Sequence, residues 1–216
     1  MVHRMNQIQL KGIGFAFIAV IFFSLSLPMT RWALESYSPI FTATGRAVIA
    51  AVAAILFLMI SGTSLLPPGH YREFIYTLIG AVFGWPILIA LALMRTETAP
   101  VAVVAAIMPL TTAIFAVLRG HEAVSRNFWI ASSLGTLILI FFTASRSNLS
   151  GEDLIADLLA FGAVLASSYC YVQGAELTRI YPGWKVISWV VVMALPVTLT
   201  ASIVLWFTVE QDLPKT

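Results

Sequence analysis

Charged residues are scarce in this 216-residue chain. Asp, Glu, Lys and Arg together make up 10% of it, whereas soluble domains carry about 25%. The 12 basic and 10 acidic residues leave a formal net charge of +2, which is too small to favour a nucleic-acid partner. This scarcity excludes a soluble globular enzyme, a nucleic-acid-binding protein and a disordered chain.

Cysteine, histidine and catalytic motifs are also sparse. Cys170 is the single cysteine, so no disulfide can form within the chain. His3, His70 and His121 all fall outside the long apolar runs. The sequence has no Walker loop, HExxH, GxSxG or CxxC motif. We therefore expect no metal ion, no cofactor and no enzymatic activity, ATP hydrolysis included.

Long apolar runs are what the chain has instead. Hydrophobic residues make up 60% of it, and its mean hydropathy is +0.94. A helix needs about 20 apolar residues to cross the hydrocarbon core of a bilayer. Seven runs approach or exceed that length: residues 12–30, 39–60, 74–94, 98–118, 127–145, 158–175 and 186–209. They lack the alternation of barrel strands, which predicts an all-α membrane protein with seven transmembrane helices.

Basic residues in the links between these runs favour one orientation. Seven lie on the side of the N-terminus: Arg4, Lys11, Arg72, Arg119, Arg126, Arg179 and Lys185. Four lie on the other side: Arg31, Arg95, Arg146 and Lys215. Because Lys and Arg are enriched in cytoplasmic links, we expect a multi-pass protein of the cytoplasmic (inner) membrane with its N-terminus in the cytoplasm.

A shift of 144 residues aligns the two ends of the chain. Residues 10–37 then lie over residues 154–181, and seven of the 28 positions are identical, Ser24/Ser168 and Tyr37/Tyr181 among them. The shift moves the first predicted helix onto the sixth, an odd number of spans later, so the second unit is inverted in the membrane. Inverted repeats are common in secondary transporters, whose substrates bind at the repeat interface.

Several short motifs follow one another in a recognisable order. They are Pro39 and then Gly45-Arg46-Ala47 in the second predicted helix, residues 99–109 at the start of the fourth, His121-Glu122 just past it, Gly135 in the fifth, and Leu158-Leu159-Ala160 in the sixth. In this order and spacing the chain resembles the drug/metabolite transporter superfamily, in particular its EamA-type branch. The resemblance covers nearly the whole chain.

The resemblance implies ten helices in two five-helix inverted repeats and carrier-type movement of small metabolites or drugs, often outward. On this pattern residues 1–146 form one complete repeat and residues 147–216 form two helices of the second, so we expect a C-terminally incomplete carrier. Two functions stay open. One is a secondary carrier for a small solute; the other is a non-transporting truncated fragment or accessory protein that packs with other membrane helices or with itself.

Arg46 is the one charged residue inside the run 39–60. A charge at the centre of a span costs about 3 kcal/mol on insertion scales, so such side chains usually face protein or water. One interpretation is that its long stem snorkels to the external surface. The other is that it lines a cavity or binds a neighbouring helix.

Prolines and polar side chains inside the runs mark a candidate solute pathway. Pro28, Pro86, Pro109 and Pro196 are expected to kink their helices. Nine residues are predicted to line the pathway: Arg46, Ser24, Ser26, Trp85, Pro86, Pro109, Thr111, Tyr169 and Gln173. Ordinary bending and helix–helix hydrogen bonds are the alternatives.

Two further patterns predict contacts rather than a pathway. The small-residue pairs Gly80/Gly84, Ala102/Ala106 and Gly162/Ala166 are expected to pack helices together. Glu176 is expected to pair with Arg179 near the cytoplasmic end of the sixth helix.

Overall fold

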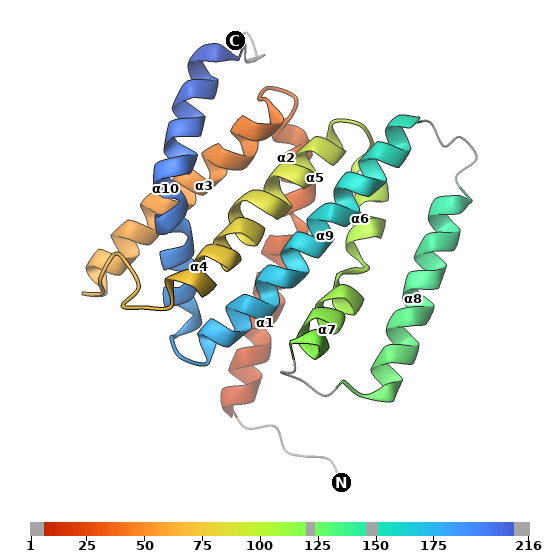
Figure 1. The fold of residues 1–216 in the computed structure, drawn as a ribbon, viewed down its shortest axis with the longest axis horizontal. Helices are drawn as coiled ribbons and strands as arrows, with labels where there is room; N and C mark the ends of the chain where they lie inside the picture. Colours follow the sequence, from red (N-terminus) through yellow and green to blue (C-terminus); the bar gives the residue numbers. More distant parts are fainter. Residues whose placement is uncertain (1–6, 120–123, 146–150, 210–216) are drawn as a thin grey trace.

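A computed structural model describes residues 7–119, 124–145 and 151–209 of the chain, and all regular elements in these residues are helices (Figure 1). They are α1 (Gln7–Ser24), α2 (Ser26–Ala33), α3 (Pro39–Ile60), α4 (Tyr71–Leu78), the π-helix η1 (Ile79–Gly84), α5 (Trp85–Leu93), α6 (Thr98–Ala105), α7 (Met108–Leu118), α8 (Arg126–Ala144), α9 (Gly151–Thr178) and α10 (Gly183–Thr208). The prediction of an all-helical protein is confirmed.

Six helical segments in the described part of the chain are long and apolar enough to cross a membrane. They are Gly12–Ala33, Pro39–Ile60, Tyr71–Leu93, Thr98–Leu118, Asp153–Thr178 and Gly183–Thr208. The predicted runs 39–60 and 98–118 have the same bounds as two of these segments. The predicted run 127–145 corresponds to α8, whose apolar part, Arg126–Phe141, is shorter than the six spanning segments. The count of seven spans therefore stays a prediction.

Prolines explain where two of the spans are divided. A proline has no N–H, and its ring clashes with the carbonyl of the fourth residue before it. Helix α1 ends at Ser24, four residues before Pro28, and α6 ends at Ala105, four residues before Pro109. Pro196 behaves differently, because α10 continues past it as one helix. The expected interruption is therefore found at two of these three prolines.

The third span packs against α9 through its glycines. A β-carbon at Gly80 would lie 2.5 Å from the carbonyl oxygen of Ala166 and 2.5 Å from the β-carbon of Cys170. A β-carbon at Gly84 would lie 2.6 Å from that of Ala166. Both glycines belong to η1, the wider π-helical turns that come just before Pro86. The packing predicted for Gly80 and Gly84 is confirmed, and Ala166, a small residue of another predicted pair, lies opposite them.

Helices α3 and α10 form the most extensive helix pair, and they run in opposite directions (Figure 1). Ala47 and Ala51 on α3 and Ala194 on α10 are all buried. Such small side chains let two helix backbones approach closely in a membrane. A buried hydrogen bond, from Ser202 Oγ to Thr44 Oγ1 at 2.9 Å, also joins the two helices.

Helix α9 runs through the middle of the molecule, with α3 and α10 on one side of it and α8 on the other (Figure 1). It contacts α4, η1, α5, α6 and α7. The hydroxyl groups of Ser168 on α9 and Thr111 on α7 lie 2.5 Å apart in a buried hydrogen bond. At the edge of the bundle, α1 leaves side chains such as Phe15 and Phe22 exposed.

Candidate functional site

A cavity of about 580 Å³ lies between α2, the α2–α3 link, α3 and α10. We call it the arginine cavity. Apolar and aromatic side chains form most of its wall, among them Met29, Tyr37, Phe41, Val48 and Ile49. Its polar groups come from Ser26, Thr30, Thr42, Arg46 and Ser202. The cavity thus combines a large apolar surface with a few polar groups, as small-molecule sites usually do.

Arg46 is the one charged side chain among the residues that line this cavity. It lies seven residues after the start of α3, or about 10 Å along the helix axis. Its side chain is exposed towards the cavity. Within the part of the chain that the structure describes, no hydrogen bond or ion pair joins Arg46 to another residue. The structure therefore places Arg46 beside open space inside a membrane-spanning helix.

Two hydroxyl groups of the wall have unused bonding capacity. The oxygen atoms of Ser26 on α2 and Thr42 on α3 are buried, and neither has a hydrogen-bond partner among the described residues. Leaving such a group unsatisfied costs about 1–3 kcal/mol. By contrast, Thr30 donates a 2.7 Å hydrogen bond to the carbonyl of Ser26 within its own helix. Because both residues line the cavity, a rotation of either side chain would present its unused hydroxyl group to a bound molecule.

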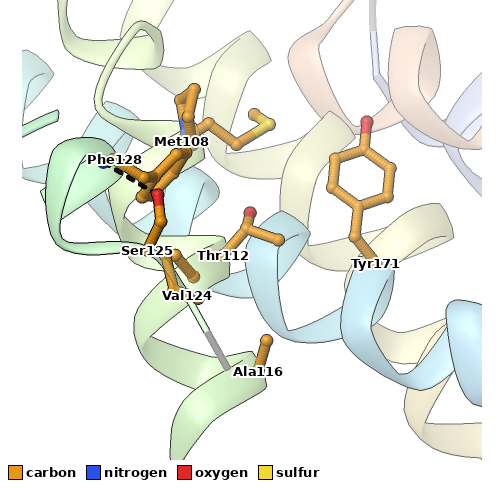
Figure 2. Close-up of a pocket in the computed structure, with 9 residues that line it drawn as sticks. Met108, Thr112, Ala116, Val124, Ser125, Phe128 and Tyr171 are labelled. Carbon is orange, nitrogen blue, oxygen red and sulfur yellow. Dashed lines mark hydrogen bonds between the residues drawn. The ribbon is translucent and has the colours of Figure 1, made fainter. Parts of the chain in front are cut away.

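A second cavity, of about 570 Å³, lies between α7, α9 and the start of α8 (Figure 2). Thr112 and Tyr171 are among the residues on its wall, and none of the described residues that line it is charged. The hydroxyl of Ser125 accepts a 3.3 Å hydrogen bond from the backbone N–H of Phe128, which caps the start of α8. The described residues of this wall offer no fixed charge to a ligand, in contrast to those of the arginine cavity.

The structure separates the nine predicted pathway residues. Ser26 and Arg46 line the arginine cavity, whereas Pro109 lines the second one. Ser24 is exposed, and its hydroxyl donates to the carbonyl of Ile21 in its own helix at 2.8 Å. The presence of a proline or a polar side chain inside an apolar run therefore does not place these residues at one cavity.

Trp85, Pro86 and Thr111 are buried in helix contacts. Trp85 belongs to the core between α5, α6 and α9, and its ring stacks on that of Phe23 at a centroid distance of 6.0 Å. Pro86 is buried beside it at the start of α5. Thr111 is held by the bond to Ser168 described above. These three side chains therefore lie in contacts between helices, as the alternative interpretation expects.

Tyr169 belongs to a charged and aromatic cluster at the end of α7. Arg119 donates from Nη1 to the Tyr169 hydroxyl at 3.1 Å, and its guanidinium lies 5.5 Å from the centre of that ring. Arg119 Nε is 3.5 Å from Glu176 Oε1, and the ring of Tyr76 meets that of Tyr169 edge-on. The sequence predicted Arg179 as the partner of Glu176, but local spacing could not reveal Arg119, which lies on another helix.

Gln173 lies one helical turn after Tyr169 but faces the protein interior. Its side chain is 1% exposed. Neither Nε2 nor Oε1 of its amide has a hydrogen-bond partner in the described residues. Of these two predicted pathway residues, Tyr169 thus lies in a surface cluster, whereas Gln173 is buried and its amide has unused bonding capacity.

Comparisons with known proteins give consistent results. The EamA-like transporter family model matches residues 10–144. The uncharacterized transporter YdeK of Bacillus subtilis (strain 168) is 36% identical over 186 residues, which are 86% of this chain and 64% of that protein. The match thus spans less than two thirds of the relative's length. No solved structure matches significantly.

Proposed function

Since the chain belongs to the EamA-like transporter family, we propose that it acts as a secondary carrier that moves small amphipathic metabolites or drugs across the cytoplasmic membrane, outward from the cell. The observation that carries this proposal is the arginine cavity, a mostly apolar space with one cationic group inside a bundle of membrane-spanning helices. Carriers hold their solutes in such cavities, part-way across the bilayer.

An inverted repeat is the architecture that we propose for this carrier. Helix α9 begins 144 residues after α1, and α10 begins 144 residues after α3. The two helices of each pair run in opposite directions (Figure 1). We assign residues 1–146 to one five-helix repeat, with α8 as its fifth span, and residues 147–216 to two helices of the second. The arginine cavity, between α2, α3 and α10, then lies where the two repeats meet.

The proposed orientation has the N-terminus in the cytoplasm. The start of α1 and the ends of α3, α7 and α9 lie at one end of the bundle, and the ends of α2 and α5 lie at the other (Figure 1). This arrangement supports the division of the basic residues into a group of seven and a group of four.

Cysteine labelling tests this orientation. In a background with Cys170→Ala, a cysteine at Asn148 should react with a membrane-impermeant maleimide added to intact cells. A cysteine at Gly69 should react only after the membrane is opened, because its link faces the cytoplasm. The unsubstituted background controls for labelling of other proteins. Reaction at Gly69 and protection at Asn148 would reverse the orientation.

Vesicle uptake tests the proposed activity. In everted membrane vesicles that contain the chain, at least one of three labelled probes, 4-phenylbutyrate, 4-phenylbutanamide or 4-phenylbutylamine, should enter saturably and faster than in vesicles without it. Arg46→Ala should lower this uptake by about tenfold, or ~1.4 kcal/mol. Arg95→Ala is the matched control, because Arg95 Nη1 donates to the Leu91 carbonyl of the adjacent helix at 2.9 Å, away from the cavity.

The absence of uptake would change the proposed function. If the folded chain gives no saturable uptake of any of the three probes, the carrier proposal fails. The proposal of a non-transporting protein that packs with other membrane helices, or with a second copy of itself, then takes its place. The exposed apolar side chains of α1 would supply the packing surface.

A further inference from the structure

Among the described residues, the wall of the arginine cavity carries a fixed positive charge and no fixed negative one. Arg46 is the charged residue there, and none of the described residues that line the cavity is acidic. A charge inside a span is costly unless it meets water or a counter-charge. Since the described residues give Arg46 no partner, a bound molecule is the source of counter-charge that fits the cavity. A guanidinium binds a carboxylate through two parallel hydrogen bonds.

The hydroxyl groups near Arg46 complete a set of donors. Thr42 lies four residues before Arg46, so the two side chains share one face of α3. Gly45, between them in sequence, also lines the cavity, and a β-carbon there would lie 3.8 Å from the ring of Phe41. Ser26 approaches from α2, and its buried hydroxyl is unpartnered, as is that of Thr42.

The rest of the wall suits an apolar body. Met29, Tyr37 and Phe41 line the cavity, and the Phe41 ring is backed by Trp206 at a centroid distance of 5.6 Å. A small inorganic anion would leave this surface without contacts. A molecule with an alkyl or aromatic portion would cover it while its anionic group reaches Arg46.

We infer that the arginine cavity binds the anionic group of an amphipathic molecule, with Arg46, Thr42 and Ser26 as donors and Phe41 and Tyr37 against its apolar part. The inference rests on the proposed function and deepens it, because it names the charge class of the solute. A neutral analogue leaves the guanidinium unpaired, and a cation meets a like charge without any carboxylate in the wall. Two sources share the required chemistry: a soluble carboxylate and the headgroup of an anionic lipid.

Binding to the purified chain tests the inference without requiring transport. The chain is placed in phosphatidylcholine nanodiscs, and its thermal unfolding is followed with 4-phenylbutyrate, with the neutral 4-phenylbutanamide and with the cationic 4-phenylbutylamine. A ligand that binds the folded state raises the unfolding temperature. We expect 4-phenylbutyrate to bind at least about tenfold more tightly than either analogue. Equal binding of the carboxylate and the amide overturns the inference.

Variants locate the binding site. Arg46→Gln should remove the preference for the carboxylate, whereas Arg46→Lys should keep the preference with weaker binding, because an ammonium is a point charge without the planar fork. Thr42→Val should weaken binding of 4-phenylbutyrate. Thr200→Val is its matched control, because the Thr200 hydroxyl is exposed on α10 and donates to the Pro196 carbonyl. If Arg46→Gln does not fold, the comparison of Thr42→Val with Thr200→Val decides the question. Equal binding by these two variants overturns the inference.

Two further comparisons distinguish the soluble carboxylate from the lipid headgroup, and the inference about charge from the carrier proposal. In nanodiscs that contain phosphatidylglycerol, competition with 4-phenylbutyrate identifies the lipid headgroup as an occupant, whereas unchanged binding identifies the soluble carboxylate. Both results support an anionic group at Arg46. Charge-selective binding without vesicle uptake overturns the carrier proposal and leaves this inference standing. Saturable uptake of the amide or the amine equal to that of the carboxylate overturns the inference and leaves the carrier proposal standing.

Discussion

Gly80→Ala is expected to destabilise the protein by about 1–3 kcal/mol, because overpacking a close contact forces atoms to move. The added methyl group would lie 2.5 Å from the carbonyl oxygen of Ala166 and the same distance from the β-carbon of Cys170. The first of these belongs to the backbone of α9, which cannot turn aside as the end of a flexible side chain can. The helices would have to separate along the contact that holds the third span to the centre of the bundle. The unfolding midpoint in detergent, followed by circular dichroism, measures the effect.

Gly135→Ala is the matched control. It adds the same methyl group to a glycine in α8, where nothing lies within 4 Å of the new carbon. Because alanine favours a helix by up to about 1 kcal/mol over glycine, this variant should keep or raise the unfolding midpoint. Equal midpoints for the two variants would contradict the close packing of η1 on α9.

Gln173→Met is expected to stabilise the protein, by about 1–3 kcal/mol. The side chain is 1% exposed, and its amide nitrogen and oxygen both lack hydrogen-bond partners in the described residues. Replacing an unsatisfied buried polar group by an apolar one of similar shape removes its desolvation cost. Methionine is suitable because it is unbranched and adapts to an irregular space. The unfolding midpoint should rise, in contrast to most core substitutions.

Leu177→Met controls for the introduction of methionine at this depth. Leu177 lies one turn further along α9 and is also 1% exposed. Since it exchanges one apolar side chain for another of similar size, this variant should change stability by less than about 1.5 kcal/mol. A fall in the midpoint of Gln173→Met below that of Leu177→Met would show that the amide of Gln173 does have a bonding partner. Vesicle uptake by the stabilised variant then tells whether the amide serves the solute pathway.

Charge and hydropathy along the sequence were enough to establish the class of the protein and much of its helix layout. Charged residues bound the apolar runs, and a charge is costly in lipid, so runs such as 39–60 could be converted directly into helices. The kinks expected at Pro28 and Pro109 coincide with the ends of α1 and α6, because the ring clashes with the carbonyl of the fourth residue before it. At Pro196 the helix continues without ending. Whether a helix breaks or continues depends on how its neighbours hold it, which local sequence does not contain.

The side chains that meet across helices could be identified only in the folded chain. Arg46, Ser26 and Ser202 line one cavity although they come from three helices. Arg119 pairs with Glu176 across the gap between α7 and α9. The sequence gives the face of a helix on which a residue lies, but in a membrane that face need not turn inward, because lipid chains are as apolar as the protein core. Without a polar side to mark the outside, the partners of each helix are fixed by close packing and hydrogen bonds. Those contacts join residues far apart in the chain, and no local pattern records them.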